Sequence, residues 1–243
     1  MLRQYPAALK VCDQILDILP DNSTALAIKV EVYQAQGNLA AAAALLSGLS
    51  GLPPHADQKL FLVQTNQWAY ERRYAEGIAA LQAAAARPDL AETEYDKIFI
   101  ESNLAWFQQL AGEAAVARST WQHVRTGIEA LRRNKGEDFA FLELASANIA
   151  LGDTASAFTI AERAAAIFSK DAMATAGVLV RRAKIAVQAG ERDLAIQQLA
   201  MSARDPIGVS YGDLKLNPLW DPLRGDPRFE KIVASLAPKP TGK

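Results

Sequence analysis

The stretch Gly37-Asn38-Leu39-Ala40-Ala41-Ala42-Ala43-Ala44-Leu45-Leu46 contains the end of one predicted helix and the start of the next. Glycine ends a helix at little cost because it lacks a Cβ and adopts the left-handed conformation readily. Five residues later, the small side chain of Ala42 allows two helices to approach closely. Four residues after that, the bulkier Leu46 fills the space between neighbouring helix pairs. The stretch therefore predicts a helical hairpin.

The same pairing of a small residue with a larger one recurs along the chain. The pairs are Ala8/Cys12, Ala42/Leu46, Gly77/Leu81, Ala117/Trp121, Ala157/Ala161 and Ala195/Leu199. The small residues are separated by 34, 35, 40, 40 and 38 positions. A glycine precedes four of these residues by five positions, at Gly37, Gly112, Gly152 and Gly190. A proline follows four of them by eleven or twelve positions, at Pro20, Pro54, Pro88 and Pro206. A period of this length predicts a stack of helical hairpins.

The first helix of each hairpin has its own marker, a large apolar residue sixteen positions before the small one. These residues are Leu26, Phe61, Phe141 and Leu179. Two units depart from the pattern, since Glu71-Arg72 replaces the glycine of the third unit and Glu101 replaces the large residue of the fourth. The longer spacing of the later units predicts a long helix from Arg118 through Arg133.

These segments resemble second-helix starts of the tetratricopeptide repeat family, and the resemblance covers almost the whole chain. It is carried by Asn38 through Leu46, by Arg73-Tyr-Ala-Glu-Gly-Ile-Ala-Ala-Leu81 and by Gly190-Glu-Arg-Asp-Leu-Ala-Ile196. The resemblance implies an all-α fold, a right-handed α-solenoid of helical hairpins with a C-terminal capping helix. We expect residues 1–22 to be the second helix of a truncated unit, residues 23–206 to form about five hairpins, and residues 207–243 to form a proline-punctuated cap.

The two ends of the array differ. The helix expected before Pro20 has no first-helix partner, so an apolar face including Leu9, Ile15 and Leu16 should be exposed, or covered by a partner or by further chain. At the other end, Leu214-Lys-Leu-Asn-Pro-Leu-Trp-Asp-Pro-Leu-Arg-Gly-Asp-Pro-Arg-Phe229 is similar to the tail of many bacterial multidomain proteins. Their N-terminal parts are serine/threonine kinase, winged-helix or TolB-like modules.

The same tail has an interpretation from its residues alone. Asp226 as N-cap and Pro227 at the first position predict a helix whose apolar side chains cover the last hairpin. In that case Trp220 and Phe229 pack in the core. The alternative is that these two aromatic residues form a recognition pocket for a partner.

Composition argues against several function classes. The chain has 26 Lys and Arg against 27 Asp and Glu, so no broad positive field is available for nucleic acid. Its longest apolar run, Leu39 to Leu46, is far shorter than the about 20 residues of a membrane span. The N-terminus lacks the pattern of a secretory signal, so we expect a cytoplasmic protein.

No catalytic motif is present in the sequence. There is no glycine-rich phosphate loop, and neither His55 nor His123 belongs to a metal-binding motif. Cys12 occupies the bulky position of its repeat, which favours a core role over that of a nucleophile. The acidic residues Glu92, Glu94 and Asp96 flank a helix start, where negative charge is favoured. We therefore expect a non-enzyme without a metal or cofactor.

The family resemblance implies that first helices line a concave wall where protein or peptide segments bind. Counted from the large first-helix residue, the inward positions are Glu31, Gln34, Asn66, Tyr70, Trp106, Lys184 and Gln188. Trp106 could equally be buried between units, because Glu101 leaves the register of its unit open. The set lacks the basic clamp with which some family members hold a chaperone's terminal carboxylate. The alternatives to an interaction scaffold are an apolar small-ligand sensor and the non-catalytic part of a kinase or regulator.

Overall fold

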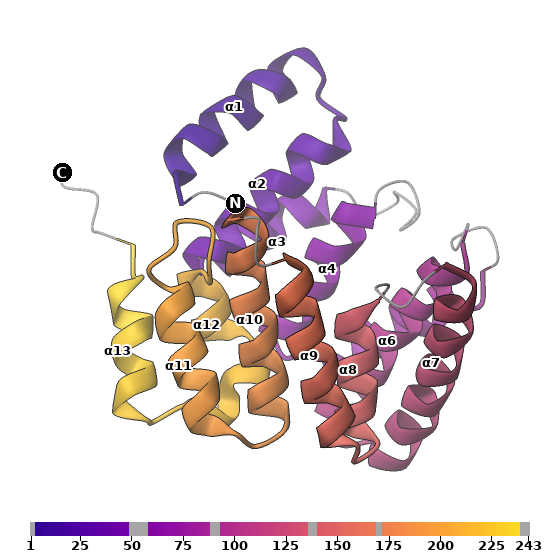
Figure 1. The fold of residues 1–243 in the computed structure, drawn as a ribbon. Coiled ribbons are helices and arrows are strands. Elements are labelled where there is room, and N and C mark those ends of the chain that lie inside the picture. The colour runs from indigo at the N-terminus through magenta and orange to yellow at the C-terminus, as the bar shows by residue number, and fades with distance from the viewer. Residues whose placement is uncertain (1–2, 49–57, 88–92, 136–139, 169–171, 239–243) are drawn as a thin grey trace. The chain divides into compact units, whose positions relative to one another are not determined.

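The computed structural model describes residues 3–48, 58–87, 93–135, 140–168 and 172–238, which form helices and turns without a strand (Figure 1). The predicted all-α fold of tetratricopeptide-like helical hairpins is confirmed. The chain divides into two compact units, residues 1–72 together with residues 200–243, and residues 73–199. Pro54, Pro88, His55 and Glu92 lie outside the described residues.

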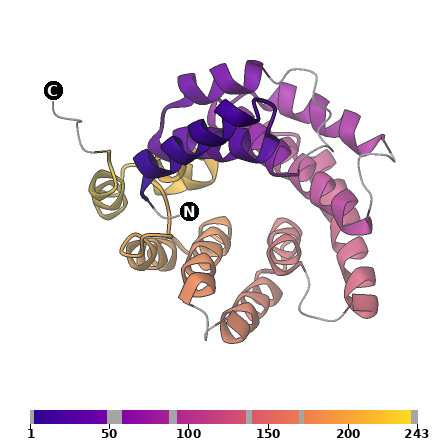
Figure 2. The same cartoon turned by 90° about the horizontal axis from the view of Figure 1, so that it is seen from above.

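The first unit combines the two ends of the chain. Its N-terminal helices are α1 (Tyr5–Ile18), α2 (Ser23–Gln36), α3 (Leu39–Ser47) and α4 (Gln58–Tyr70). Its C-terminal helices are α12 (Tyr211–Leu216), η2 (Pro218–Leu223) and α13 (Pro227–Ser235). α2 packs against α1, α3 and α4, and it also contacts α12. Figures 1 and 2 show this junction, where α12 contacts α2 and α13 packs against α12.

The second unit is a run of consecutive hairpins. Its helices are α5 (Tyr74–Ala85), α6 (Glu94–Leu110), α7 (Ala114–Lys135), α8 (Phe141–Ala150), α9 (Thr154–Phe168), α10 (Ala172–Gln188) and α11 (Arg192–Ser202), which ends in the other unit. Each helix from α5 to α9 packs against the next one. The first helices α6, α8 and α10 also contact one another in sequence, as expected for stacked hairpins.

The turns form where the glycines predict them. Gly37, Gly112, Gly152 and Gly190 have φ between 80° and 92°, the left-handed conformation that ends a helix. In the third sequence repeat, which lacks the glycine, Arg72 takes this conformation with φ of 60°. A side chain with a Cβ is strained there, so neighbouring contacts must hold Arg72 in place.

The small and large residues of the repeat are buried in the core as predicted, except for Ala8, which is half-buried. Ala42, Leu81, Ala157, Ala195 and Leu199 are completely buried. Gly77 shows why a small residue is needed, because a Cβ there would lie 2.1 Å from Cε1 of Phe107. The Phe107 ring is itself held edge-on against Trp106, with ring centroids 5.4 Å apart.

The helix caps also follow the sequence. Asn22 accepts a hydrogen bond from the backbone N–H of Ala25, and Asp226 accepts one from that of Arg228. Thr93 and Asp96 form a reciprocal capping box at the start of α6, which confirms the cap interpretation of this acidic cluster. The predicted long helix is confirmed as α7. Within the described residues no helix has the length and apolarity needed to cross a membrane.

One prediction about α1 is wrong in detail. The expected exposed face included Leu9 and Leu16, but both side chains are half-buried because they lie on the side of the helix that holds the buried Cys12. The exposed apolar residues are Val11, Ile15 and Ile18. The burial of Cys12 confirms its core role, and burial raises the pKa of its thiol, which keeps the sulfur protonated and unreactive.

We expect Gly77→Ala to destabilise the protein by about 1–3 kcal/mol, because the added methyl group overlaps the fixed ring of Phe107. The matched control is Gly177→Ala in α10, where an added Cβ meets no atom within 4 Å. That control should be neutral or stabilise by up to about 1 kcal/mol through helix propensity. Urea denaturation of both variants measures the difference, and equal effects would contradict the packing account.

Candidate binding surface

The C-terminal segment meets the N-terminal helices through a backbone contact. A Cβ on Gly212 would lie 1.7 Å from the carbonyl oxygen of Gln34 and 2.9 Å from the backbone nitrogen of Gly37. The Tyr211 ring covers the other side of the same turn, 3.1 Å from where a Cβ of Gly37 would stand. Only glycine fits at position 212, so α12 is seated directly on the end of α2.

A partly buried carboxylate extends this contact. Oδ1 of Asp213 accepts hydrogen bonds from the Tyr70 hydroxyl at 3.2 Å and from Nδ2 of Asn217 at 2.9 Å. Oδ2 accepts one from Nε1 of Trp220 at 3.1 Å. Burial, followed by the negative charge of Asp213, raises the pKa of Tyr70 well above its ordinary value of 10.0. The hydroxyl therefore remains a donor, and we call Tyr70, Asp213, Asn217 and Trp220 the Asp213 network.

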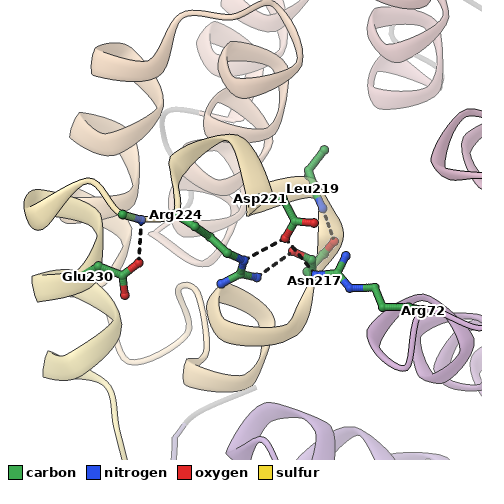
Figure 3. Close-up of polar contacts among 7 residues, drawn as sticks. Arg72, Asn217, Leu219, Asp221, Arg224 and Glu230 are labelled. Atoms are coloured by element: carbon green, nitrogen blue, oxygen red, sulfur yellow. Dashed lines mark hydrogen bonds and ion pairs between the residues drawn. The ribbon is translucent and has the colours of Figure 1, made fainter. Parts of the chain in front are cut away.

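Figure 3 shows a second, more exposed set of polar contacts, which shares Asn217 with this network. Oδ1 of Asp221 accepts from Nη2 of Arg72 at 2.9 Å and from Nε of Arg224 at 2.8 Å. The side-chain oxygen of Asn217 accepts from the backbone N–H of Leu219 at 3.0 Å. The ion pair between Arg72 and Asp221 is one contact that holds the backbone of Arg72 in its left-handed conformation. Because these groups are partly solvated, each pair contributes little to stability, about 1 kcal/mol or less.

The start of the described chain is tied to the same C-terminal segment. The backbone N–H of Arg3 donates to the carbonyl of Pro206 at 3.1 Å. Its guanidinium donates to the carbonyls of Ala203 at 3.0 Å and Val209 at 2.9 Å. The C-terminal segment is therefore held at two places within its unit, at Arg3 and at the end of α2.

The interpretation of Trp220 and Phe229 as a recognition pocket is wrong, because both side chains are completely buried. Leu214 and Leu223 are buried with them. The large apolar side chains of this segment belong to the core, and several of its polar side chains form hydrogen bonds with one another.

The predicted groove residues of the first unit are largely engaged inside the protein. Gln34 is 3% exposed, and its Nε2 donates to the carbonyl of Val63 at 2.8 Å and to Oε1 of Gln67 at 3.0 Å. Tyr70 belongs to the Asp213 network. Glu31 is partly exposed and its Oε2 lies 3.4 Å from Nζ of Lys59. Asn66 is half-buried. The chain's own C-terminal segment thus contacts this face at Gln34 and Tyr70.

The predicted residues of the second unit are partly exposed. Trp106 is half-buried, packing against the core cluster around Trp121 while part of its ring remains accessible. Lys184 and Gln188 are also half-buried on α10. The hydroxyl of Ser146 donates to Oε1 of Gln188 at 3.5 Å, so α8 and α10 present these two side chains to the same face.

Ser146 is a residue that the sequence prediction missed. It stands five positions after Phe141, the same offset that selected Glu31, Asn66 and Lys184 in other sequence repeats. The repeat register therefore contained the signal. Asp213 had no such signal, because it lies outside the repeat and its partner Tyr70 is far away in the chain.

The described residues offer little support for a metal site or for a pocket that binds an apolar ligand. No group of three or more His, Cys, Asp and Glu side chains is placed to hold a metal ion there. An apolar pocket between α8, α9 and α10, lined by Phe141, Ile160, Val178 and Ile185 among others, has an internal volume of about 10 Å³. That is room for about one water molecule, and too little for an apolar ligand.

We expect Asp213→Asn to lower the free energy of unfolding by about 1–3 kcal/mol. The amide nitrogen must face a hydrogen-bond donor, since both carboxylate oxygens accept in the native protein. Asp221→Asn is the matched control, an exposed carboxylate in the same segment, with an expected loss of about 1 kcal/mol or less. Chemical denaturation near neutral pH gives both values. Equal losses would show that the Asp213 network adds nothing beyond surface pairing.

Comparison with known proteins adds one finding. A family model described as tetratricopeptide repeat matches residues 2–59, which contain α1, α2 and α3. A search of curated proteins found no match. The match supports tetratricopeptide repeats in this part of the chain, in agreement with the hairpins that the structure shows.

Proposed function

We propose that this chain is a non-catalytic protein-interaction scaffold that binds a peptide segment on the first helices of its second unit. Tetratricopeptide repeats generally mediate protein–protein interaction. The proposed surface, which we call the α6–α10 face, consists of Trp106, Ser146, Lys184 and Gln188. The observation that carries the proposal is that α8 and α10 pack against each other, with Ser146 and Gln188 3.5 Å apart on one partly exposed face.

The two units differ in what their first helices offer a partner. In the first unit, Gln34 and Tyr70 already bond inside the protein. In the second unit, the side chains at the equivalent positions remain partly accessible. We therefore assign the α6–α10 face as the principal binding surface and give Glu31 and Asn66 a secondary role.

The chemistry of this face indicates the kind of peptide that it fits. The partly exposed Trp106 offers an apolar anchor of the kind that often dominates interface energy. Lys184 has no ion pair within the described residues and supplies a positive charge. Ser146 and Gln188 can donate to and accept from a peptide backbone. A peptide that combines an apolar side chain with an acidic one matches this set.

We further propose that the chain acts as a regulatory region of a larger cytoplasmic bacterial protein. The support is the resemblance of residues 214–229 to tails that follow tetratricopeptide repeats in kinase, winged-helix and TolB-like proteins. The complete burial of Trp220 indicates that the most specific residue of this tail serves the fold. The upstream module, rather than this tail, would supply any activity.

Selection from a random peptide display library tests the binding proposal. We expect enriched peptides to carry an apolar residue near an acidic one. Trp106→Ala should weaken their binding by about 30-fold, as for an interface anchor worth about 2 kcal/mol. Lys184→Glu should weaken it by about tenfold through charge repulsion. Isothermal titration calorimetry measures both dissociation constants.

The matched control is Arg118→Glu on α7, an exposed charge reversal outside the α6–α10 face, which should leave peptide binding unchanged. Thermal melting of each variant separates lost binding from lost structure, a necessary check for Trp106 because its ring also touches the core. Failure to enrich any peptide, or binding that is equal for Lys184→Glu and the wild type, would exclude this face.

A further inference from the structure

Gly177 is a glycine inside α10 that the fold itself does not require. In a helix interior, glycine is less favourable than every residue except proline, because it gives the unfolded chain the most freedom. At Gly77, Gly127 and Gly212, which also lie inside helices, an added Cβ would stand between 1.7 and 3.1 Å from a neighbouring residue. At Gly177 it would meet no described atom within 4 Å, and the backbone there is not left-handed. Neither packing nor backbone conformation therefore accounts for this glycine.

The open space over Gly177 lies on the accessible side of α10. Gly177, Arg181, Lys184 and Gln188 follow the i, i+4, i+7, i+11 spacing, so they fall within about 60° of one another around the helix. The completely buried Ala186 lies on the opposite side. Since Lys184 and Gln188 belong to the α6–α10 face, Gly177 and Arg181 continue that face towards the start of α10.

The missing side chain allows another polypeptide to reach the backbone of α10. Without a Cβ, the surface over Gly177 is lower than it would be over an alanine by about the width of a methyl group. The backbone of a bound partner can therefore lie in van der Waals contact with the helix backbone. Because the glycine disfavours the helix and fills no packing need, a close approach of this kind is the reason that we assign to it.

Two positive side chains stand beside this open space. Arg181 is exposed and Lys184 is partly exposed, and neither forms an ion pair within the part of the chain that the structure describes. The carboxylate of Glu143 on the neighbouring α8 accepts a hydrogen bond from the hydroxyl of Tyr95 at 3.3 Å. Two cations about one helical turn apart favour acidic side chains in a partner.

The polar side chains of the face favour an extended partner over a helical one. Ser146 and Gln188, which lie 3.5 Å apart, can each donate and accept hydrogen bonds. An extended segment has free backbone N–H and C=O groups for such side chains, whereas a helix uses its own internally. Alternate side chains of an extended segment lie on one side, about 7 Å apart, which matches two cations one helical turn apart.

We propose that an extended acidic peptide segment crosses α10 at Gly177, with its backbone against this glycine and with acidic side chains at alternate positions paired with Arg181 and Lys184. The inference rests on the proposed function of the α6–α10 face as a peptide-binding surface. It adds the chemical class and conformation of the peptide, and it assigns Gly177 as the residue that determines how closely the peptide approaches.

The tightest peptide selected from the display library on the wild-type chain is the probe, titrated calorimetrically into variants of the full chain. Enriched peptides should carry Asp or Glu at positions i and i+2. Gly177→Ala should weaken binding by about tenfold and Gly177→Leu by about 100-fold, because the added side chain lifts the peptide from the helix. Both variants should melt at or above the wild-type temperature, since alanine and leucine favour a helix. A purely structural role of Gly177 would not combine lost binding with retained stability.

Two further variants separate added bulk from charge. Ala79→Leu, at an exposed position of α5, is the matched control for bulk and should bind the peptide as the wild type does. Arg181→Glu should weaken binding by about tenfold through charge repulsion. A probe whose acidic residues are replaced by lysine should bind the wild type weakly and the double variant Arg181→Glu, Lys184→Glu more tightly.

The outcomes distinguish this inference from the proposed function on which it rests. If no peptide is enriched, both are overturned. If peptide binding depends on Trp106 and Lys184 but is equal for Gly177→Leu and the wild type, the proposed function stands and this inference is overturned. Acidic residues spaced by three or four positions, or a gain of helical circular dichroism on binding, would identify a helical partner and overturn it as well.

Discussion

The missing side chain of Gly212 is the constraint on which the first unit depends. Because no Cβ stands at this position, the backbone of α12 contacts the carbonyl of Gln34 at the end of α2. The Tyr211 ring then covers Gly37, whose left-handed conformation ends the same helix. Any larger residue at position 212 would push the C-terminal segment away from the N-terminal helices.

One bond of the Asp213 network joins the C-terminal segment to the N-terminal helices, because Tyr70 lies on α4 whereas Asn217 and Trp220 belong to the same segment as Asp213. The carboxylate lies in a partly buried position, where an unpaired charge would be costly. Three donors compensate for this cost, the hydroxyl of Tyr70, the amide of Asn217 and the indole N–H of Trp220. Each of these side chains would itself be left with an unsatisfied polar group without Asp213. The network therefore favours a single arrangement of the C-terminal segment.

The same contacts explain how the first helices of the two units differ in accessibility. In the first unit, Gln34 on α2 and Tyr70 on α4 are engaged by the chain itself. In the second unit, Ser146 and Gln188 bridge neighbouring first helices, while Trp106 and Lys184 remain partly accessible.

Local chemistry determined the helical hairpins, and these could be predicted from the sequence. A glycine at a helix end, an N-cap such as Asn22 and a small residue such as Ala42 act on neighbours within a few positions, so their spacing contains the information. The register also placed Trp106, Lys184 and Gln188 on first helices, and it could have found Ser146. Contacts between distant segments were decided only by the tertiary structure. Tyr70 reaches Asp213, and Gly212 reaches Gln34, because folding brings together two ends of the chain that share no repeat period.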